Sequence, residues 1–249
     1  MLPFIVASLS LATEPASVHH ERVEQIRMIE ATEGVLWRAA PHPRFSSSAP
    51  GASASMNGVK NDWKKEILAG VAAGEIHEFS PSSNAAVPTS FDSETAFPQC
   101  AKVIGDIRDQ SNCGCCWAFA GAEAASDRMC ISSNATLKLA LSAQDVCFCS
   151  SFNGCGGGMI STPWNFIKKK GAVTGGLYKN SGPFTGMCSD FTLPHCHHHG
   201  PQGDDPYPAE GKPGCPSETS PKCPKKCDAD ASSDHSDFED DKYSFVGRE

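Results

Sequence analysis

The sequence predicts a mainly helical, disulfide-bonded protein, and three observations carry this prediction. Small residues recur at helical spacing from Ala120 to Met129, directly after a cysteine-rich turn. The chain contains 13 cysteines, a number typical of proteins that fold in an oxidising compartment, and an odd number leaves at least one thiol unpaired. Its 249 residues are enough for one large or two small domains.

The composition also limits the classes of partner. The formal net charge of −8 argues against a nucleic-acid partner. No stretch of the sequence reaches the length of a membrane-spanning helix, so we expect no membrane partner. The expected class is therefore a disulfide-bonded globular protein that meets neither nucleic acid nor lipid.

The N-terminal part is predicted to contain a leader, a helix and a linker. Residues 1–18 open with a short apolar run followed by small residues, which resembles a secretory signal peptide; an N-terminus misplaced by gene prediction is the alternative. Residues 19–38 place three β-branched residues on one side of a predicted helix. Residues 41–55 are rich in Pro, Ser, Ala and Gly and are predicted to be a flexible linker.

Three later segments have sequence patterns that predict their local structure. Residues 80–89 form a predicted loop of the kind where proteolytic nicking concentrates, so a mature chain is expected to begin between Val87 and Ser90. Ser142 is placed to cap a helix that starts after it. Residues 161–170 are predicted to form a helix that ends in three lysines, which complement the negative end of the helix dipole.

The cysteine-rich turn enters the central helix at Cys115 and Cys116. A thiol at a helix N-terminus meets unpaired N–H groups and the positive end of the dipole, and both favour the thiolate. The thiolate is the form that attacks carbon. This position therefore indicates a nucleophilic cysteine, with a disulfide cysteine at a helix start as the alternative.

The residues of this turn resemble the active-site signature of papain-like cysteine peptidases. The run from Cys113 to Phe119 reads Cys-Gly-Cys-Cys-Trp-Ala-Phe, close to the cathepsin form Cys-Gly-Ser/Ala-Cys-Trp/Tyr. The segments that resemble the cathepsin B branch are Phe91-Asp92, Phe97-Pro98-Gln99-Cys100, Ile107-Arg108-Asp109-Gln110, Ser126-Asp127-Arg128 and Gly175-Gly176-Leu177-Tyr178. The resemblance implies an α+β fold, the papain-like cysteine peptidase fold, in which a helical left domain precedes a β-rich right domain.

The resemblance also assigns roles in the cleft. Cys116 matches the nucleophile. Gln110 matches the residue whose side-chain N–H joins the Cys116 backbone N–H in the oxyanion hole. Gly157 and Gly158 match the glycines that bond the main chain of the substrate as an extended strand.

The chain departs from the family pattern at three positions of this region. Ser111 stands where the family has glycine, which predicts a strained loop if the position needs a positive φ. Cys115 stands where the family has serine, and a thiol beside the nucleophile is expected to form a competing disulfide or to oxidise. Gly156 replaces an asparagine.

Residues 188–227 are rich in Cys, Pro and His. Such a cluster alone suggests a metal site, but the spacing fits no zinc template and the oxidising context favours disulfides, so we expect no metal and no cofactor. The segment resembles the occluding loop of cathepsin B. His198 and His199 match the pair that caps the primed side of the cleft and binds the C-terminal carboxylate of a peptide, and Asp109 matches a residue that pairs with this loop.

The same resemblance implies five disulfides. They are Cys100–Cys130, Cys113–Cys155, Cys149–Cys223, Cys188–Cys227 and Cys196–Cys215. Cys115, Cys116 and Cys147 remain, and Cys147 is an alternative to Cys149 as the partner of its bond.

The resemblance divides the chain into a signal peptide, residues 1–18, a propeptide, residues 19–88, and a partial peptidase domain, residues 89–249. The last is expected to comprise the left domain at 89–187, the occluding loop at 188–227 and an acidic, solvated loop at 228–249.

Residues 61–70 resemble the cathepsin B prosegment, which crosses the active-site cleft and keeps the zymogen inactive. Trp63 is the residue predicted to anchor it. A surface tryptophan in a disordered leader is the alternative.

The chain is expected to lack the catalytic histidine and asparagine. The papain mechanism needs both, and in cathepsins they follow the cysteine by ~130–150 residues. The context of His235 resembles neither family motif, so His235 is predicted to be a surface residue. We therefore expect the β-rich right domain to be largely absent and the chain as given to be inactive.

Two functions remain open at this point. The first is a monomeric, C-terminally incomplete, cathepsin B-like cysteine endopeptidase and peptidyl-dipeptidase that forms an acyl-enzyme with peptide and protein substrates and has its own prosegment as inhibitor. The second is a naturally truncated, non-catalytic binding or decoy homologue, or a pseudogene product. The cysteine content and the sequon at Asn134 predict a glycoprotein of the secretory pathway, and the resemblance implies a lysosomal or secreted destination.

Overall fold

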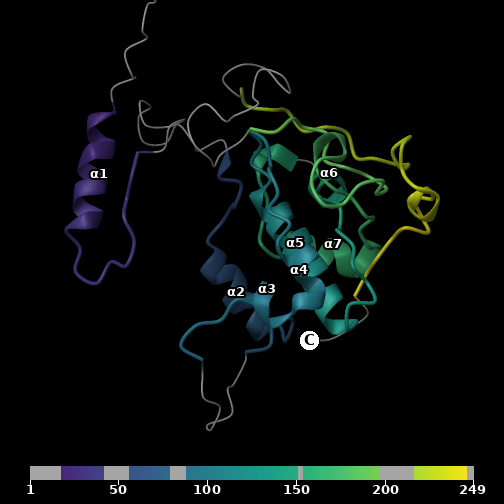
Figure 1. The fold of residues 1–249 in the computed structure, drawn as a ribbon, viewed down its shortest axis with the longest axis horizontal. Coiled ribbons are helices and arrows are strands. Elements are labelled where there is room, and N and C mark those ends of the chain that lie inside the picture. The colour runs from purple at the N-terminus through teal and green to yellow at the C-terminus, as the bar shows by residue number, and fades with distance from the viewer. Residues whose placement is uncertain (1–17, 42–55, 79–87, 151–153, 197–215, 246–249) are drawn as a thin grey trace, which may run out of the picture. The chain divides into compact units, whose positions relative to one another are not determined.

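The structure is a computed structural model that describes residues 18–41, 56–78, 88–150, 154–196 and 216–245 (Figure 1). The chain divides into two compact units, Met1–Ser53 and Ala54–Glu249. Nearly all of the predicted signal peptide and linker lies outside the described residues. The residues that resemble a prosegment, from 61 onward, belong to the same unit as the cysteine-rich turn.

The first unit contains one described helix, α1 (His20–Glu30). The sequence predicted a helix over residues 19–38, so the prediction is right in type but eight residues too long at its end. The helix stops because the chain turns after Ala31 and Gly34 adopts a φ of 82°, a conformation that glycine adopts without steric cost. No residue of α1 is buried.

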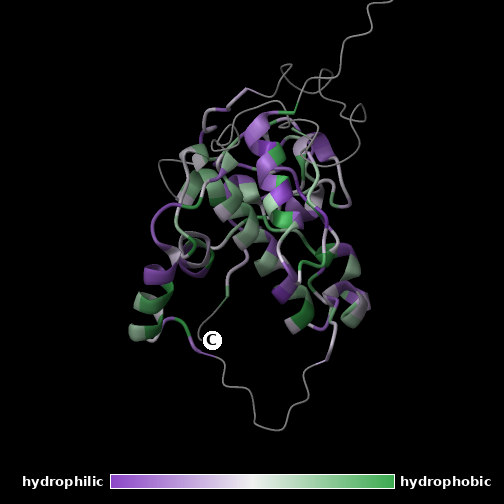
Figure 2. Ribbon diagram, turned by 90° about the vertical axis from the view of Figure 1, so that its left-hand side faces the viewer, coloured by the Kyte–Doolittle hydropathy of each residue, from purple (hydrophilic) through white to green (hydrophobic). Residues whose placement is uncertain are grey.

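The second unit is built from six α-helices among its described residues. They are α2 (Trp63–Ala72), α3 (Ser93–Ala96), α4 (Ala101–Ile104), α5 (Cys116–Ser132), α6 (Ala143–Ser150) and α7 (Thr162–Lys170). Short 3₁₀ turns lie at Pro98–Cys100, Gly154–Gly156, Tyr178–Asn180 and Ser233–His235. Figure 2 shows that the helical segments carry both apolar and polar residues.

Helix α5 is the centre of the packed core, and α5, α6 and α7 contact one another (Figure 1). Ala118, Ala122 and Ala125 are fully buried, and their small side chains let neighbouring helices approach. At Gly121 a side chain would have its Cβ 2.3 Å from Pro163 of α7, so only glycine fits this helix crossing. The helix is longer at both ends than the predicted Ala120–Met129.

Other local predictions are confirmed. The Ser142 hydroxyl accepts a hydrogen bond from the Asp145 N–H at 3.0 Å and so caps α6. Helix α7 carries its lysines in the last turn and ends at Gly171, which has a φ of 76°. Among the described helices, none combines the length and hydropathy that crossing a membrane requires.

Pairing between extended segments is limited to single bridges in the part of the chain that the structure describes. They join Leu141 to Thr174, Ala172 to Tyr243 and Val59 to Gly158. The prediction that this chain carries mainly the helical domain of an α+β fold is confirmed by this helix-rich arrangement.

Four of the implied disulfides are present, namely Cys100–Cys130, Cys113–Cys155, Cys149–Cys223 and Cys188–Cys227. Cys196 is also disulfide-bonded, and its expected partner Cys215 lies outside the described residues. A sixth bond, Cys115–Cys147, was not in the implied set. Cys147 therefore does not replace Cys149, and Cys115 does not pair with its neighbour Cys116.

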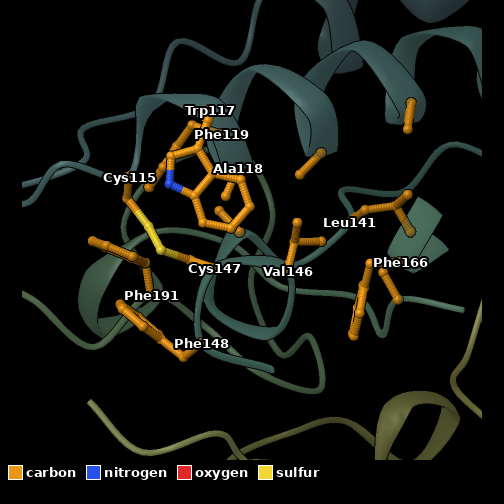
Figure 3. Packing of buried hydrophobic residues seen from close by; sticks show 14 of the residues in the cluster. Cys115, Trp117, Ala118, Phe119, Leu141, Val146, Cys147, Phe148, Phe166 and Phe191 are labelled. Atoms are coloured by element: carbon orange, nitrogen blue, oxygen red, sulfur yellow. A yellow bond between two sulfur atoms is a disulfide. The ribbon is translucent and has the colours of Figure 1, made fainter. Parts of the chain in front are cut away.

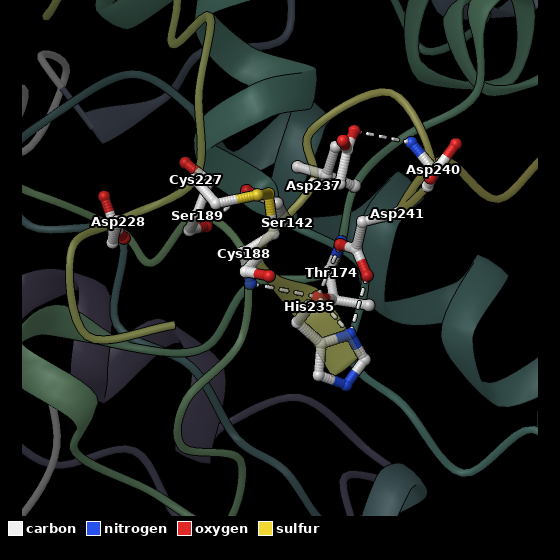
Figure 4. The surroundings of a disulfide bond; sticks show 12 residues. Ser142, Thr174, Cys188, Ser189, Cys227, Asp228, His235, Asp237, Asp240 and Asp241 are labelled. Carbon is white, nitrogen blue, oxygen red and sulfur yellow. Dashed lines mark hydrogen bonds and ion pairs between the residues drawn. A yellow bond between two sulfur atoms is a disulfide. The ribbon is translucent and has the colours of Figure 1, made fainter. Parts of the chain in front are cut away.

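The prediction that His235 is a simple surface residue is wrong. Its Nδ1 lies 2.6 Å from an oxygen of Asp241, whose other oxygen accepts hydrogen bonds from the N–H and hydroxyl of Thr174, each at 2.7 Å (Figure 4). Asp241 and Thr174 are buried, and the hydroxyl of Thr174 in turn accepts the Cys188 N–H. This cluster ties residues 233–243 to the body of the unit beside the Cys188–Cys227 disulfide.

We expect Asp241→Asn to lower the free energy of unfolding by about 2 kcal/mol, because it removes one of two oxygens that satisfy three buried or half-buried donors. Urea denaturation followed by circular dichroism measures the change. The exposed neighbour Asp240 offers a matched control, and Asp240→Asn should stay within about 0.5 kcal/mol of the parent. Equal effects of the two substitutions would contradict a structural role for the cluster.

Candidate active site

Cys116 is the first residue of α5, and its side chain is half-buried. It is the one free cysteine among the described residues. Backbone N–H groups of a first helical turn have no partner within the helix, so they are available to a ligand at this end. The structure therefore places the predicted nucleophile at a helix N-terminus with an unmodified thiol.

Gln110, the predicted oxyanion donor, belongs to the turn that precedes this thiol. Its Nε2 donates to the backbone oxygen of Cys113 at 2.7 Å, which fixes the side-chain amide relative to the turn. The same Nε2 donates to the backbone oxygen of Met56 at 2.9 Å. A carbonyl oxygen of the chain itself thus lies against the predicted oxyanion donor.

Residues 56–60, which we call the strap, run past both groups. The Gly58 N–H donates to the Cys116 Sγ at 3.1 Å, and the Gly58 carbonyl accepts the Gly158 N–H at 2.8 Å. The Lys60 N–H donates to the Gly158 carbonyl at 2.9 Å, and Val59 forms a parallel bridge with Gly158. The strap is therefore held on the thiol and on a predicted peptide-binding glycine by main-chain hydrogen bonds.

These contacts need glycine on both sides. A Cβ on Gly58 would lie 1.8 Å from the backbone oxygen of Gly114, and Gly58 is buried. A Cβ on Gly158 would lie 2.6 Å from the ring of Trp117, which packs beneath it. Gly157 has a φ of 99°, which a residue with a side chain rarely adopts. The strap and the glycines therefore approach each other as bare main chain.

Helix α2 follows the strap and adds one polar contact. An oxygen of Glu66 accepts the Ser161 N–H at 2.8 Å, just before α7 begins. Trp63, the predicted anchor, has half of its surface exposed at the first position of α2. The anchor role of Trp63 stays a prediction, and the hydrogen bonds described for this segment come from the strap and from Glu66.

The loop before the nucleophile has a positive φ at Ser111, the position where the family has glycine. Ser111 has a φ of 60° and is fully buried, so the position does use the left-handed region. One oxygen of Asp109 accepts the Ser111 N–H at 2.7 Å and the other accepts the Cys196 N–H at 3.1 Å. Asp109 thus contacts the start of the predicted occluding loop. His198 and His199 lie outside the described residues.

A charge network links residues 106–108 to two carboxyl groups of α5. Arg108 donates to Asp106 at 2.8 Å and to the Leu141 carbonyl at 2.8 Å, with the Arg108 and Asp106 side chains almost fully buried. Burial raises the pKa of Glu123 from 4.5 to about 7; the Arg108 charge opposes this, and Asp106 and Asp127 add to it. Burial also raises the pKa of Asp127. A carboxyl group of α5 therefore titrates near neutral pH.

No described histidine hydrogen-bonds to the Cys116 Sγ, whose recorded partner is the Gly58 N–H. His235 is paired with Asp241, and the Nε2 of His195 lies 3.1 Å from the Ser181 hydroxyl. Within the described residues, the strap thus joins the predicted nucleophile, the predicted oxyanion donor and a predicted peptide-binding glycine, and no histidine lies in hydrogen-bond contact with the thiol.

Sequence reasoning missed the strap. The resemblance to a prosegment was assigned to residues 61–70, whereas the contacts with Cys116 and Gln110 come from Met56 and Gly58. The one signal available was the Asn57-Gly58 pair, since a glycine outside a helix marks a turn or a close backbone approach. That signal does not say what the glycine approaches.

Comparisons with known proteins identify the family of this chain. A family model described as "Papain family cysteine protease" matches residues 87–246. Cathepsin B-like cysteine proteinase 6 of Caenorhabditis elegans is 38% identical over 221 residues, covering 84% of this chain and 52% of the relative. Cathepsin B-like cysteine proteinase 4 of C. elegans is 46% identical over 112 residues, covering 44% of this chain and 32% of the relative.

A third relative, a cathepsin B-like cysteine proteinase of Schistosoma japonicum, is 43% identical over 118 residues, covering 47% of this chain and 33% of the relative. Among solved structures, procathepsin B S9 from Trypanosoma congolense matches with a TM-score of 0.56 and 22% identity over 87% of this chain and 61% of that chain. The chain spans about half the length, or less, of the curated relatives it matches.

Proposed function

Because the chain belongs to the papain family of cysteine proteases, we propose that it acts in a cathepsin B-like peptidase precursor, with Cys116 as the nucleophile and the strap as the inhibitor. One observation carries the proposal. The Gly58 N–H is hydrogen-bonded to the Cys116 Sγ while the Gly58 carbonyl is bonded to Gly158. The chain's own extended segment thus occupies the thiol and the glycine that would hold a peptide.

The proposed reaction is hydrolysis of a peptide bond through a thioester. The Cys116 thiolate attacks the carbonyl carbon, and the carbonyl electron pair moves to the oxygen, which accepts hydrogen bonds from the Cys116 N–H and Gln110 Nε2. The C–N bond then breaks as the amine takes a proton from a histidine outside the described residues. Water hydrolyses the thioester and returns the thiol.

In this proposal the strap inhibits by occupying the groups that would bind a peptide substrate. While the strap lies on Gly158, a peptide substrate cannot form the same main-chain hydrogen bonds. Because Gln110 Nε2 donates to Met56, the oxyanion donor is engaged as well. Cleavage in the predicted loop at residues 80–89 would separate the strap from the peptidase part and let it dissociate.

The cellular route and the exopeptidase activity are further parts of the proposal. The disulfides and the exposed sequon residue Asn134, just after α5, support passage through the secretory pathway to a lysosomal or secreted destination. Release of C-terminal dipeptides would depend on His198 and His199. Since that pair lies outside the described residues, peptidyl-dipeptidase activity stays a prediction from the sequence.

Cys116→Ala is expected to abolish peptidase activity of the full-length protein after removal of its prosegment, because no other described cysteine is a free thiol. Hydrolysis of a panel of fluorogenic dipeptides and labelling by iodoacetamide, followed by mass spectrometry, measure the effect. The parent should be labelled at Cys116 and the variant at no described cysteine. Turnover that survives in Cys116→Ala would overturn the nucleophile assignment, and peptide binding without turnover in the parent would favour the non-catalytic alternative.

A further inference from the structure

We propose that the Cys115–Cys147 disulfide is a brace that positions the nucleophile, an inference that rests on the proposed role of Cys116. Cys115 is the N-cap residue of α5 and Cys147 belongs to α6. Both are 0% exposed. Figure 3 shows the disulfide inside the core, with the ring of Trp117 on one side and that of Phe191 on the other. The bond therefore joins the residue before Cys116 to a second helix through the core.

The turn that carries Cys116 is fixed from two sides. Cys113 is bonded to Cys155, and the Gly114 N–H donates to the Cys155 carbonyl at 3.0 Å. The sulfur atoms of Cys113, Cys115 and Cys147 all lie within 4.8 Å of one another. Two disulfides thus meet behind one turn of three residues, and each leads to a different segment of the unit.

The brace acts on the first turn of α5. The Cys115 carbonyl accepts the N–H groups of Ala118 and Phe119, at 2.9 and 3.1 Å, so movement of Cys115 would reorient the peptide groups around Cys116. The N–H groups of Cys116 and Trp117, which precede these two and have no acceptor within the helix, are what this helix N-terminus offers to a thiolate and to an oxyanion. Loss of the brace is therefore expected to change the reactivity of Cys116 and not only the stability of the fold.

The Cys116 thiol and the Cys115–Cys147 disulfide differ in their exposure to solvent. Cys116 is half-buried, so a small dithiol can reach it, whereas Cys115–Cys147 is screened by the core. Reduction of a disulfide takes two electrons and two protons from the dithiol, which itself becomes a cyclic disulfide. Conditions that keep the nucleophile reduced are thus expected to leave the brace intact. Cys149–Cys223 is the internal comparison, because Cys223 is exposed.

The test compares three forms of the mature, full-length protein. They are the parent, C115S/C147V, which removes the brace and refills the buried volume, and C149S/C223S, which removes one disulfide elsewhere. We measure the rate at which iodoacetamide labels Cys116 from pH 5 to 9. C115S/C147V should shift the pH profile to higher pH and slow labelling at pH 6 by about tenfold. C149S/C223S should keep the parent profile.

A second measurement on the parent covers the case in which C115S/C147V fails to fold. Native protein is treated with increasing dithiothreitol, alkylated and mapped by mass spectrometry. Cys149 and Cys223 should be labelled well before Cys115 and Cys147, with the Cys116 profile unchanged until the brace opens. Early labelling of Cys115, or a parent profile in C115S/C147V, would overturn the brace while leaving the nucleophile in place. If Cys116 of the parent reacts no faster than a cysteine peptide, the proposed function itself fails.

Discussion

Replacing Gly58 by valine is expected to release the strap and raise the labelling of Cys116 by iodoacetamide in the precursor by about tenfold or more. The first carbon of the new side chain would lie 1.8 Å from the Gly114 oxygen, and a backbone atom cannot swing aside. The strap must therefore withdraw, which breaks the hydrogen bonds of Gly58 to Cys116 and Gly158. Each lost bond contributes about 1 kcal/mol, and 1.4 kcal/mol corresponds to tenfold.

The neighbouring residue provides the control for this experiment. Asn57 is exposed, so Asn57→Val adds the same side chain one position away without a clash. Its labelling rate should match that of the parent precursor. If Gly58→Val were labelled as slowly as Asn57→Val, the strap would not be what shields the thiol.

Glu123→Gln is expected to stabilise the protein at pH 8 and to have little effect at pH 4.5. Burial raises the pKa of Glu123 to about 7 in the folded state, above its ordinary value of 4.5. Between these two values the folded state holds a proton that the unfolded state has released, so the stability that Glu123 contributes is complete below pH 4.5 and is lost as the pH rises through 7. Glutamine resembles the protonated form and does not titrate.

The size of this effect follows from the same values. A pKa change from 4.5 to about 7 corresponds to at most about 3 kcal/mol, and the partial exposure of Glu123 reduces the expected gain to on the order of 1 kcal/mol. Urea denaturation at pH 4.5 and pH 8 measures it, with the exposed Glu94→Gln as the matched control. A stability difference that is the same at both pH values would show that folding does not shift the pKa of Glu123.

Two further carboxyl groups act in the same direction. Burial raises the pKa of Asp145 to about 6, against an opposing hydrogen bond from the Val173 N–H. Burial also raises the pKa of Asp190 to about 6, where Asp228 and Asp230 add to the effect and the Gly176 N–H opposes it. Both groups therefore lower stability as the pH rises from about 4 to 6. Glu123, Asp145 and Asp190 thus favour the folded state in mild acid, a direction that suits the lysosomal destination in the proposed function.

The sequence predicts those parts of the site whose chemistry is local. Cys116 and Gln110 belong to one short motif, and the turn that joins them follows from its own residues. The cap by Ser142 involves atoms three residues apart, so it too is readable along the chain. Gly158 comes from a separate motif, but its glycines already indicate a close approach of main chain.

The remaining features depend on contacts that leave no local pattern. The strap contacts Cys116 through a backbone N–H, 58 residues away in sequence. Because every residue except proline has this group, the sequence of the strap does not predict the contact. In the sequence Cys115 and Cys147 remain without an assigned partner, and only packing of the core places them next to each other. His235 lies in an acidic stretch that reads as solvated, although one of its aspartates, Asp241, turns inward to Thr174.

The main-chain contacts of the strap determine which of its positions accept substitution. The hydrogen bonds that hold the strap use its peptide groups. The side chains of Asn57, Val59 and Lys60 therefore contribute little to its binding. Substitutions at these positions leave the hydrogen bonds possible, whereas position 58 has no room for a Cβ. A synthetic pentapeptide with glycine at its centre and varied flanking residues should therefore compete with the strap for the hydrogen bonds of Cys116 and Gly158.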